Sequence, residues 1–110
     1  MTFDIGDIVR VPFPFTDRTS HKRRPAIVLS TKPFNDSHMH LILAMITSAK
    51  NSSWPSDIVI TDLASTGLQN ASVIRFKIFT LDERLVLGKL GKISKKDGHA
   101  LKKQMANVFS

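Results

Sequence analysis

The feature that most constrains the fold is a series of short runs of apolar and β-branched residues, each ended by a turn signal. In residues 8–13, Ile8, Arg10 and Pro12 alternate with apolar neighbours, which is the period of a β-strand. Further runs predict strands at residues 25–30, 40–46, 57–61, 72–81 and 85–90. The run at 40–46 is almost entirely apolar, so we expect it to be buried on both faces. Such a series favours a strongly bent sheet or a small barrel.

Only the C-terminal stretch has a helical pattern. Ser94 and Asp97 have the spacing of a capping box, with Asp in place of the usual Glu or Gln. Gly98 weakens the first turn by up to ~1 kcal/mol relative to Ala. Apolar residues follow at i, i+4 and i+7, at Leu101, Met105 and Val108. The sequence therefore predicts a mainly β protein whose C-terminal helix packs on one side of the sheet.

The charge balance points to an anionic partner. The 110 residues are enough for a single domain, which we place at 1–110. Lys and Arg number 16 against 9 Asp and Glu, which favours nucleic acid, an acidic protein or a membrane surface. No apolar run approaches ~20 residues and no signal peptide is evident, so we expect a cytoplasmic protein without membrane contact. With no Cys, the chain has no disulfide and no thiolate ligand or nucleophile.

Several blocks of this sequence, in order, resemble the MazF/PemK (Kid-like) family of toxins of type II toxin–antitoxin systems. The blocks are Gly6–Val9, Arg24–Leu29, Ile46–Ser48, Leu68–Arg75 and Leu87–Ser94. The resemblance implies a single MazF/PemK-like domain with the fold of an SH3-like small β-barrel (PemK/CcdB-like). It also implies a homodimer with RNA crossing the interface and a cognate antitoxin covering the same surface. Operator DNA is expected to be bound only by the toxin–antitoxin complex.

The activity that the resemblance implies is sequence-specific, metal-independent cleavage of single-stranded RNA without a cofactor. RNA carries its own nucleophile, the 2′-hydroxyl beside each phosphate. The protein then has to supply a base, an acid and positive charge on the phosphoryl oxygens. The products implied are a 2′,3′-cyclic phosphate and a 5′-hydroxyl end.

Arg24 and Thr47 are the first two candidate catalytic residues. The planar guanidinium of Arg24 fits a phosphate with two hydrogen bonds, and its high pKa suits it to stabilise charge rather than to transfer protons. Thr47 ends an apolar strand, where its hydroxyl can orient the scissile phosphate or donate to it. The resemblance implies these same roles. A solvated Arg and a Thr bonded to local backbone are the alternatives.

The general base is less defined, because the resemblance leads us to expect Arg-x-Asp where this chain has Arg75-Phe76-Lys77. A protonated Lys77 cannot replace a carboxylate base. His21, in the basic loop 16–23, is the best substitute, since histidine titrates near neutrality, and Asp17 is a weaker candidate. Asp82, in Thr80-Leu81-Asp82, resembles an Asp of the family to which the resemblance assigns a structural role rather than that of the base.

Other residues are candidates for RNA contacts rather than for catalysis. Arg23, Arg75 and Lys77 can attract phosphates, and Trp54 can stack on a base, although core packing is equally open to it. His38 and His40 would share one strand face, but no third metal ligand is evident, so we expect no metal site. Six lysines near the C-terminus are expected to form the solvated face of a helix, and a face that attracts phosphate or antitoxin is the alternative. The six lysines are Lys89, Lys92, Lys95, Lys96, Lys102 and Lys103.

Two alternatives share the expected fold but lack the cleavage reaction. One is a gyrase-poisoning toxin of the CcdB type, which binds its target through a C-terminal Trp-Gly-Ile tail. This chain ends Asn107-Val108-Phe109-Ser110, which argues against that type. The other is a nucleic-acid-binding barrel without catalysis, which Lys77 makes plausible.

Overall fold

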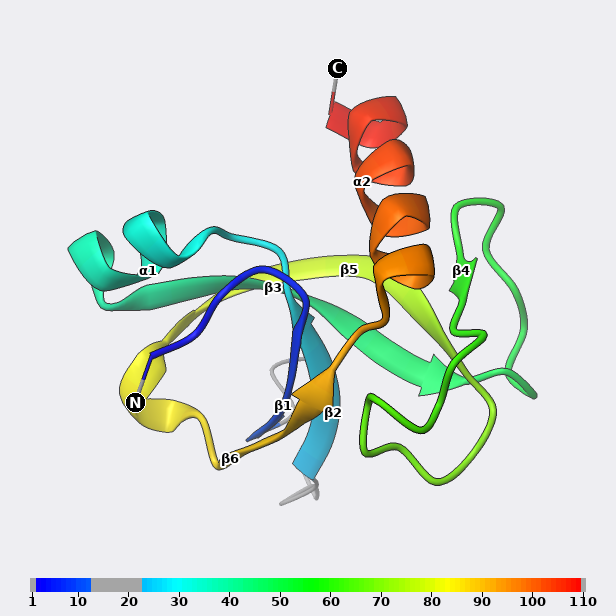
Figure 1. Cartoon of the computed structure of the whole chain (residues 1–110), viewed down its shortest axis with the longest axis horizontal. Helices are drawn as coiled ribbons and strands as arrows, with labels where there is room; N and C mark the ends of the chain where they lie inside the picture. Colours follow the sequence, from blue (N-terminus) through cyan, green and yellow to red (C-terminus); the bar gives the residue numbers. More distant parts are fainter. Residues whose placement is uncertain (1, 13–22, 110) are drawn as a thin grey trace.

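The chain is built around one curled antiparallel sheet with a long helix standing against it (Figure 1). The structure, a computed structural model, describes residues 2–12 and 23–109. Within these residues the strand order is β4-β5-β3-β2-β1-β6. The strands are β1 Asp7–Pro12, β2 Arg23–Val28, β3 His40–Ser48, β4 Ile58–Val59, β5 Ser72–Asp82 and β6 Gly88–Lys92. The helices are α1 Lys32–His38, a 3₁₀ turn η1 Glu83–Leu85, and α2 Lys95–Phe109.

The sheet curls into a half-barrel, and the segment after β4 spans the gap between its two edges. The backbone N–H of Lys92 in β6 donates to the Ser65 carbonyl oxygen at 2.9 Å. The close approach of these two segments requires a glycine in each of them. A Cβ on Gly67, whose φ is +76°, would overlap the Leu90 carbonyl, and one on Gly91 would lie 2.5 Å from the Ser65 oxygen. The mainly β fold with a C-terminal helix is confirmed.

Two apolar clusters lie on opposite faces of the central strands. Neighbouring residues alternate between them, so Ile8 and Ile27 belong to one cluster, and Val9 and Val28 to the other. In β3, Leu41 and Leu43 face one cluster while Ala44 and Ile46 face the other. The prediction of burial on both faces is therefore confirmed for residues 41–46, whereas His40 at the start of the strand is exposed.

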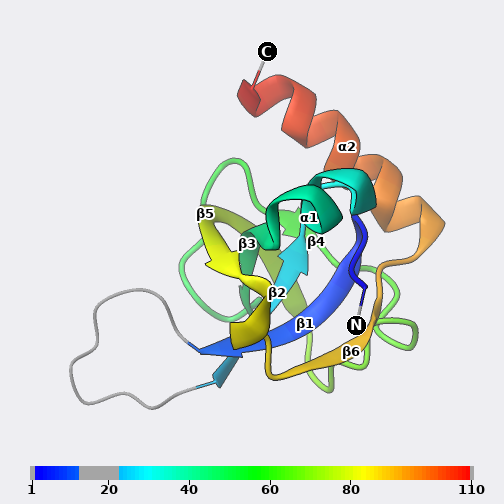
Figure 2. The same cartoon turned by 90° about the vertical axis from the view of Figure 1, so that its left-hand side faces the viewer.

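Helix α2 packs on the first of these clusters and is fixed at its start by two polar contacts. The Ser94 hydroxyl accepts from the Asp97 N–H at 3.2 Å, as the predicted cap requires. The Asp97 carboxylate accepts from the Thr61 N–H and hydroxyl at 2.9 and 2.6 Å, which ties α2 to the segment after β4. Leu101 is buried and Met105 packs against the same cluster, whereas Val108 is 44% exposed where the C-terminal end of the helix projects away from the sheet (Figure 2).

A short helix, α1, was not expected from the sequence. Seven residues with Pro33 near the start are too few to show a helical period, and Thr31 makes no side-chain cap. The helix ends at Met39, whose φ is +54°. Its buried Asn35 donates to the Phe3 and Ser30 carbonyl oxygens at 3.0 and 3.1 Å. The helix is thus anchored by a polar side chain rather than by an apolar face.

The strand predicted at 85–90 is shifted. Glu83–Leu85 forms the 3₁₀ turn, capped by the Asp82 carboxylate, and β6 begins only at Gly88. Asp82 also accepts from the guanidinium of Arg84 at 2.7 Å, and these hydrogen bonds hold the pKa of Asp82 far below its usual range. Asp82 thus caps a turn and pairs with Arg84, which is a structural role of the kind that the family resemblance implies.

An irregularity in β5 lies beside the strand end that carries Thr47. Ala44 of β3 pairs with Ile78, yet the next residue, Met45, pairs with Arg75. Phe76 and Lys77 are therefore extra residues on β5. Bulges of this kind bend a strand and redirect its side chains.

Within residues 2–12 and 23–109, no helix is long and apolar enough to cross a membrane.

Candidate nucleic-acid site

The ends of β2 and β3 bring Arg24 and Thr47 to the same place. Ala26 pairs with Met45, and the same antiparallel count two residues further on brings Arg24 level with Thr47. Both residues line two adjoining pockets. The structure thus places together two residues that are 23 positions apart in the sequence (47 minus 24).

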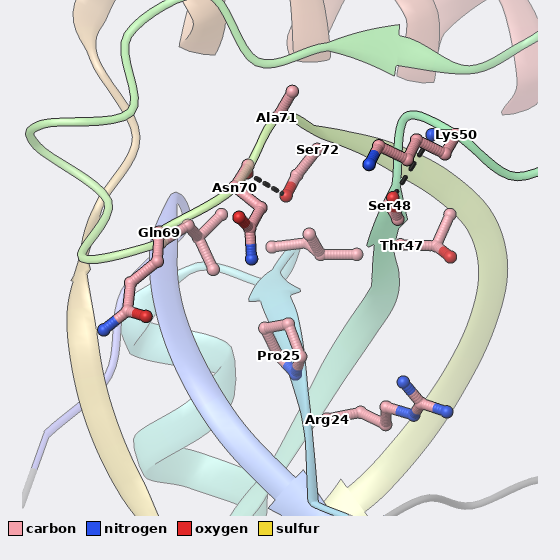
Figure 3. A pocket seen from close by; sticks show the side chains of 11 residues that line it. Arg24, Pro25, Thr47, Ser48, Lys50, Gln69, Asn70, Ala71 and Ser72 are labelled. Atoms are coloured by element: carbon pink, nitrogen blue, oxygen red, sulfur yellow. Dashed lines mark hydrogen bonds between the residues drawn. The ribbon is translucent and has the colours of Figure 1, made fainter.

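The first pocket, here called the amide pocket, has a volume of about 460 Å³. Figure 3 shows Gln69 and Asn70 on one side, Thr47 and Ser48 on the opposite side, and Arg24 below them. Carboxamides both donate and accept hydrogen bonds, as the edges of nucleobases do. The remaining lining is Pro25, Ile46, Lys50, Leu68, Ala71 and Ser72.

The second pocket, here called the basic pocket, has a volume of about 360 Å³. It shares Arg24, Ile46 and Thr47 with the amide pocket and adds Met45, Asn51, Ser52, Arg75 and Lys77. Among the described residues that line the two pockets, four are cationic and none is acidic. The walls therefore suit an anionic ligand.

Asn51 controls the direction of the Thr47 hydroxyl. The Asn51 amide donates to Thr47 Oγ1 at 2.6 Å. Because a hydroxyl has one hydrogen and two lone pairs, this bond uses a lone pair and leaves the hydrogen to point elsewhere. The arrangement suits Thr47 to donate to a phosphoryl oxygen.

Arg75, predicted to contact RNA, is 8% exposed and is held from behind by Asp57. Its Nε and Nη2 donate to the two Asp57 carboxylate oxygens at 3.1 and 2.8 Å, and Nη2 also donates to the Ser52 carbonyl. The Arg75 guanidinium holds the pKa of Asp57 below its ordinary value, and Asp57 raises the pKa of Arg75. The side chain is therefore a wall of the basic pocket in a fixed orientation, rather than a mobile surface cation.

Trp54 lies in the loop between β3 and β4 and is 39% exposed. The Arg75 guanidinium carbon is 5.2 Å from the centre of the Trp54 ring, and Lys77 Nζ is 6.0 Å from it. Trp54 is thus absent from the buried core, and the ring borders the cationic side of the basic pocket.

His21 and the alternative base Asp17 lie outside the described residues, so their roles remain predictions. Arg23, the first residue of β2, is exposed. It lies next to Arg24 at the start of β2 and remains a candidate for phosphate contact.

The two histidines considered for metal binding do not share a strand. His38 ends α1 and His40 begins β3, with His40 Nδ1 2.9 Å from the His38 carbonyl oxygen. The described part of the chain contains no group of three or more His, Asp or Glu side chains arranged to hold a metal ion.

The lysines near the C-terminus do not form one helix face. Lys89 and Lys92 belong to β6, where their Nζ atoms lie 3.2 and 3.9 Å from the buried Asp7 carboxylate. Lys95, Lys96, Lys102 and Lys103 lie on α2. The prediction of a single solvated helical face was wrong for the first two.

Four residues near the site were not predicted from the sequence. They are Asn51, Asp57, Gln69 and Asn70. Asn51 follows β3 and bonds back to Thr47 four residues earlier, and Asp57 bonds to Arg75, 18 residues later on β5; no period of the sequence indicates either contact. Gln69 and Asn70 follow the turn at residues 65–68 in a polar stretch, and polar loop residues next to a strand were the one available signal.

Comparison with solved structures finds the same fold. The solved structures that resemble the chain include a MazE–MazF complex from Deinococcus radiodurans, with a TM-score of 0.76 and 20% identity over 100% of this chain and 97% of that one. They also include the Mycobacterium tuberculosis toxin MazF-mt6, with a TM-score of 0.74 and 18% identity over 94% and 95% of the two chains. A third is a mycobacterial endoribonuclease in complex with its cognate antitoxin, with a TM-score of 0.73 and 13% identity over 96% and 91%. At these identities the likeness shows the fold.

The comparison with curated proteins finds no match. The sequence profile of PemK-like, MazF-like toxins of type II toxin–antitoxin systems, however, matches residues 4–109, almost the whole chain. The chain therefore belongs to the PemK-like, MazF-like toxin family of type II toxin–antitoxin systems.

Proposed function

We propose that this toxin is a sequence-specific endoribonuclease that cleaves single-stranded RNA without a metal ion or other cofactor. The observation that carries the proposal is the position of Arg24 and Thr47 where the two pockets adjoin, among cationic and amide walls. A phosphate at that junction would place the two nucleotides it joins in different pockets. One pocket offers amides for base edges, and the other offers positive charge and a nearby aromatic ring.

The reaction proceeds by attack of the RNA 2′-oxygen on the adjacent phosphorus. The bond from phosphorus to the 5′-oxygen breaks and the leaving oxygen takes up a proton from solvent water, which gives a 2′,3′-cyclic phosphate and a 5′-hydroxyl. Arg24 stabilises negative charge on the phosphoryl oxygens, and the Thr47 hydroxyl donates to one of them. No metal-bound water is needed, because the nucleophile belongs to the substrate.

His21 is the proposed base that removes the 2′-hydroxyl proton. The ordinary pKa of a histidine side chain, about 6.5, leaves a large fraction of the imidazole neutral at physiological pH. Lys77 and the exposed Arg23 contribute positive charge to the path of the RNA backbone.

The partners follow from the same surface. We propose a cytoplasmic homodimer of single-domain chains, with RNA crossing the dimer. A cognate antitoxin would occupy the same surface, here called the shared groove, which contains the amide pocket and the basic pocket. The similar solved structures include a MazE–MazF complex and an endoribonuclease in complex with its cognate antitoxin, which supports such a partner. Operator DNA is proposed as a ligand only of the toxin–antitoxin complex.

The test is cleavage of a long single-stranded RNA by the purified protein in EDTA, with the ends of the products identified chemically. Arg24→Ala should lower the cleavage rate by ~10²-fold or more, by analogy with loss of one oxyanion donor. Arg84→Ala is the matched control, since Arg84 pairs with Asp82 at an exposed position outside both pockets. Activity that EDTA abolishes and Mg²⁺ restores would contradict the mechanism.

The same assay separates the second candidate function, an RNA-binding barrel without catalysis. That alternative is favoured by the absence of acidic residues among the described pocket walls. Saturable RNA binding without any cleavage, in a folded protein, would favour it over the endoribonuclease.

Competition between RNA and antitoxin tests the shared groove. A disordered acidic segment would present carboxylates where RNA presents phosphates, so each ligand should displace the other, and association should slow as salt rises. Arg24→Ala should weaken both. Simultaneous binding of an uncleavable RNA and the antitoxin at full affinity would show that the sites are separate.

A further inference from the structure

Both backbone polar groups of Trp54 are bonded to one residue, Asp57. The Trp54 N–H donates to Asp57 Oδ2 at 2.9 Å, and the Asp57 N–H donates to the Trp54 carbonyl oxygen at 3.0 Å. The loop at this point is therefore a closed turn whose side-chain anchor is the Asp57 carboxylate.

That anchor is itself fixed by Arg75, which lies in strand β5. The side chains of Arg75 and Asp57 are only 10% and 8% exposed, and two hydrogen bonds join them. Opening such a pair would leave a buried charge without its partner, which is strongly unfavourable. The Asp57–Arg75 pair is thus a stable support beneath the Trp54 turn.

The ring of Trp54 lies against this support and beside the basic pocket. Arg75 and Lys77, which among the described residues contact the ring as cations, both line the pocket next to Arg24 and Thr47. The residue is nevertheless 39% exposed, so the Arg75 contact leaves a substantial part of Trp54 accessible. An aromatic ring on basic ground is the surface on which single-stranded nucleic acids stack their bases.

We propose that Trp54 is the stacking surface for one nucleobase of the RNA, next to the scissile phosphate, and that the Asp57–Arg75 pair holds it in place. Asp57 is then a positioning residue that acts on RNA through Trp54. Arg75 supports the ring from behind instead of meeting a phosphate. This inference rests on the proposed function, since it assigns one nucleotide of the proposed substrate to the basic pocket.

Trp54 fluorescence reports on this site alone, because the chain has one Trp and no Tyr. The probe is a random-sequence mixture of single-stranded 2′-O-methyl RNA, in which the nucleophile is blocked. Its binding should quench Trp54 emission in proportion to the RNA bound, as measured separately by filter retention. Trp54→Ala should weaken retention by about 5- to 150-fold, the range expected for loss of one base–aromatic stack, and Trp54→Phe should largely restore it.

The role of the Asp57–Arg75 pair is tested in the protein without RNA. Replacing both charges, in Asp57→Asn/Arg75→Met, avoids an unpaired buried charge and keeps an acceptor for the Trp54 N–H. Emission should shift to the red and collisional quenching by acrylamide should increase, because the ring is no longer fixed. Asp57→Asn alone, which leaves the Arg75 charge without its partner, should change both signals in the same direction. Asp36→Asn removes the same charge from an exposed ion pair on α1 and should change neither.

The variants also separate support of the ring from direct RNA contact. If the pair acts through Trp54, adding Asp57→Asn to Trp54→Ala should not weaken RNA retention further. Additive losses, or unchanged emission in the pair variants, would overturn the positioning role. RNA that is retained without quenching would overturn the stacking site while leaving the endoribonuclease proposal intact. Absence of any RNA retention would overturn both.

Discussion

The hydrogen bond from Asn51 to Thr47 gives a prediction about catalysis that can be worked from the structure. The bond is 2.6 Å long and joins two uncharged groups. A neutral hydrogen bond contributes about 0.5–1.5 kcal/mol, and each 1.36 kcal/mol changes a rate tenfold. If the bond only orients the Thr47 hydroxyl, Asn51→Ala should lower kcat by about 2- to 13-fold.

The Michaelis constant should change little, because Asn51 contributes orientation rather than charge. Thr47→Ala removes the proposed donor itself and should lower kcat by more than Asn51→Ala does. In the Thr47→Ala background, Asn51→Ala should have no further effect, since the atom to which Asn51 donates is gone.

The measurement is single-turnover cleavage of one defined RNA by the four proteins of this double-mutant cycle. Asn107→Ala, which removes an amide bonded to Gln104 on α2, is the matched control and should leave kcat unchanged. Thermal unfolding checks that each variant is folded. Independent, multiplicative losses in the double variant would refute the orientation argument, as would an Asn51→Ala protein with full activity.

Further predictions concern pH and stability. If His21 is the base, activity should rise with pH through about 6.5, and His21→Ala should remove that rise; an unchanged profile would exclude it and favour Asp17. Burial raises the pKa of Asp97, but hydrogen bonds outweigh burial and hold the pKa below its model-compound value of 3.8. Its stabilising contribution is therefore complete above that value and is lost as pH falls through the lower folded pKa, so Asp97→Asn should reduce the acid sensitivity of urea unfolding. Gly98→Ala places a Cβ 3.7 Å from Ile93 Cγ2, an ordinary contact, and should raise the free energy of unfolding by about 0.5–1 kcal/mol, measured by urea titration.

The strands could be predicted because their pattern is local. A residue such as Ile8 or Leu43 is identified by its own neighbours, and period two is enough to mark a strand. Helix α1 shows the opposite case, since it is held by Asn35, whose partners Phe3 and Ser30 lie outside the helix. Nothing in seven mostly polar residues indicates that an amide will be buried there.

The candidate site divides in the same way. Arg24 and Thr47 end predicted strands, so their neighbourhood follows once those strands pair. The orientation of Arg75 does not follow, because it depends on a carboxylate 18 residues earlier in the chain and on the irregularity in β5. From the sequence, Arg75 is simply a basic residue in a strand, and an RNA contact was the natural expectation.

The position of Asp57 bears directly on the missing base. The resemblance led us to expect a carboxylate two residues after Arg75, where this chain has Lys77, yet the structure places against Arg75 the carboxylate of Asp57, from the loop just before β4. That carboxylate is unsuited to accept a proton from RNA. Its two oxygens already accept from Arg75 and from the Trp54 N–H, and the guanidinium lowers its pKa. A base with a lowered pKa takes up protons poorly near neutrality. Asp57 is thus suited to hold Trp54 and Arg75 in place, and His21 remains the first candidate for proton removal.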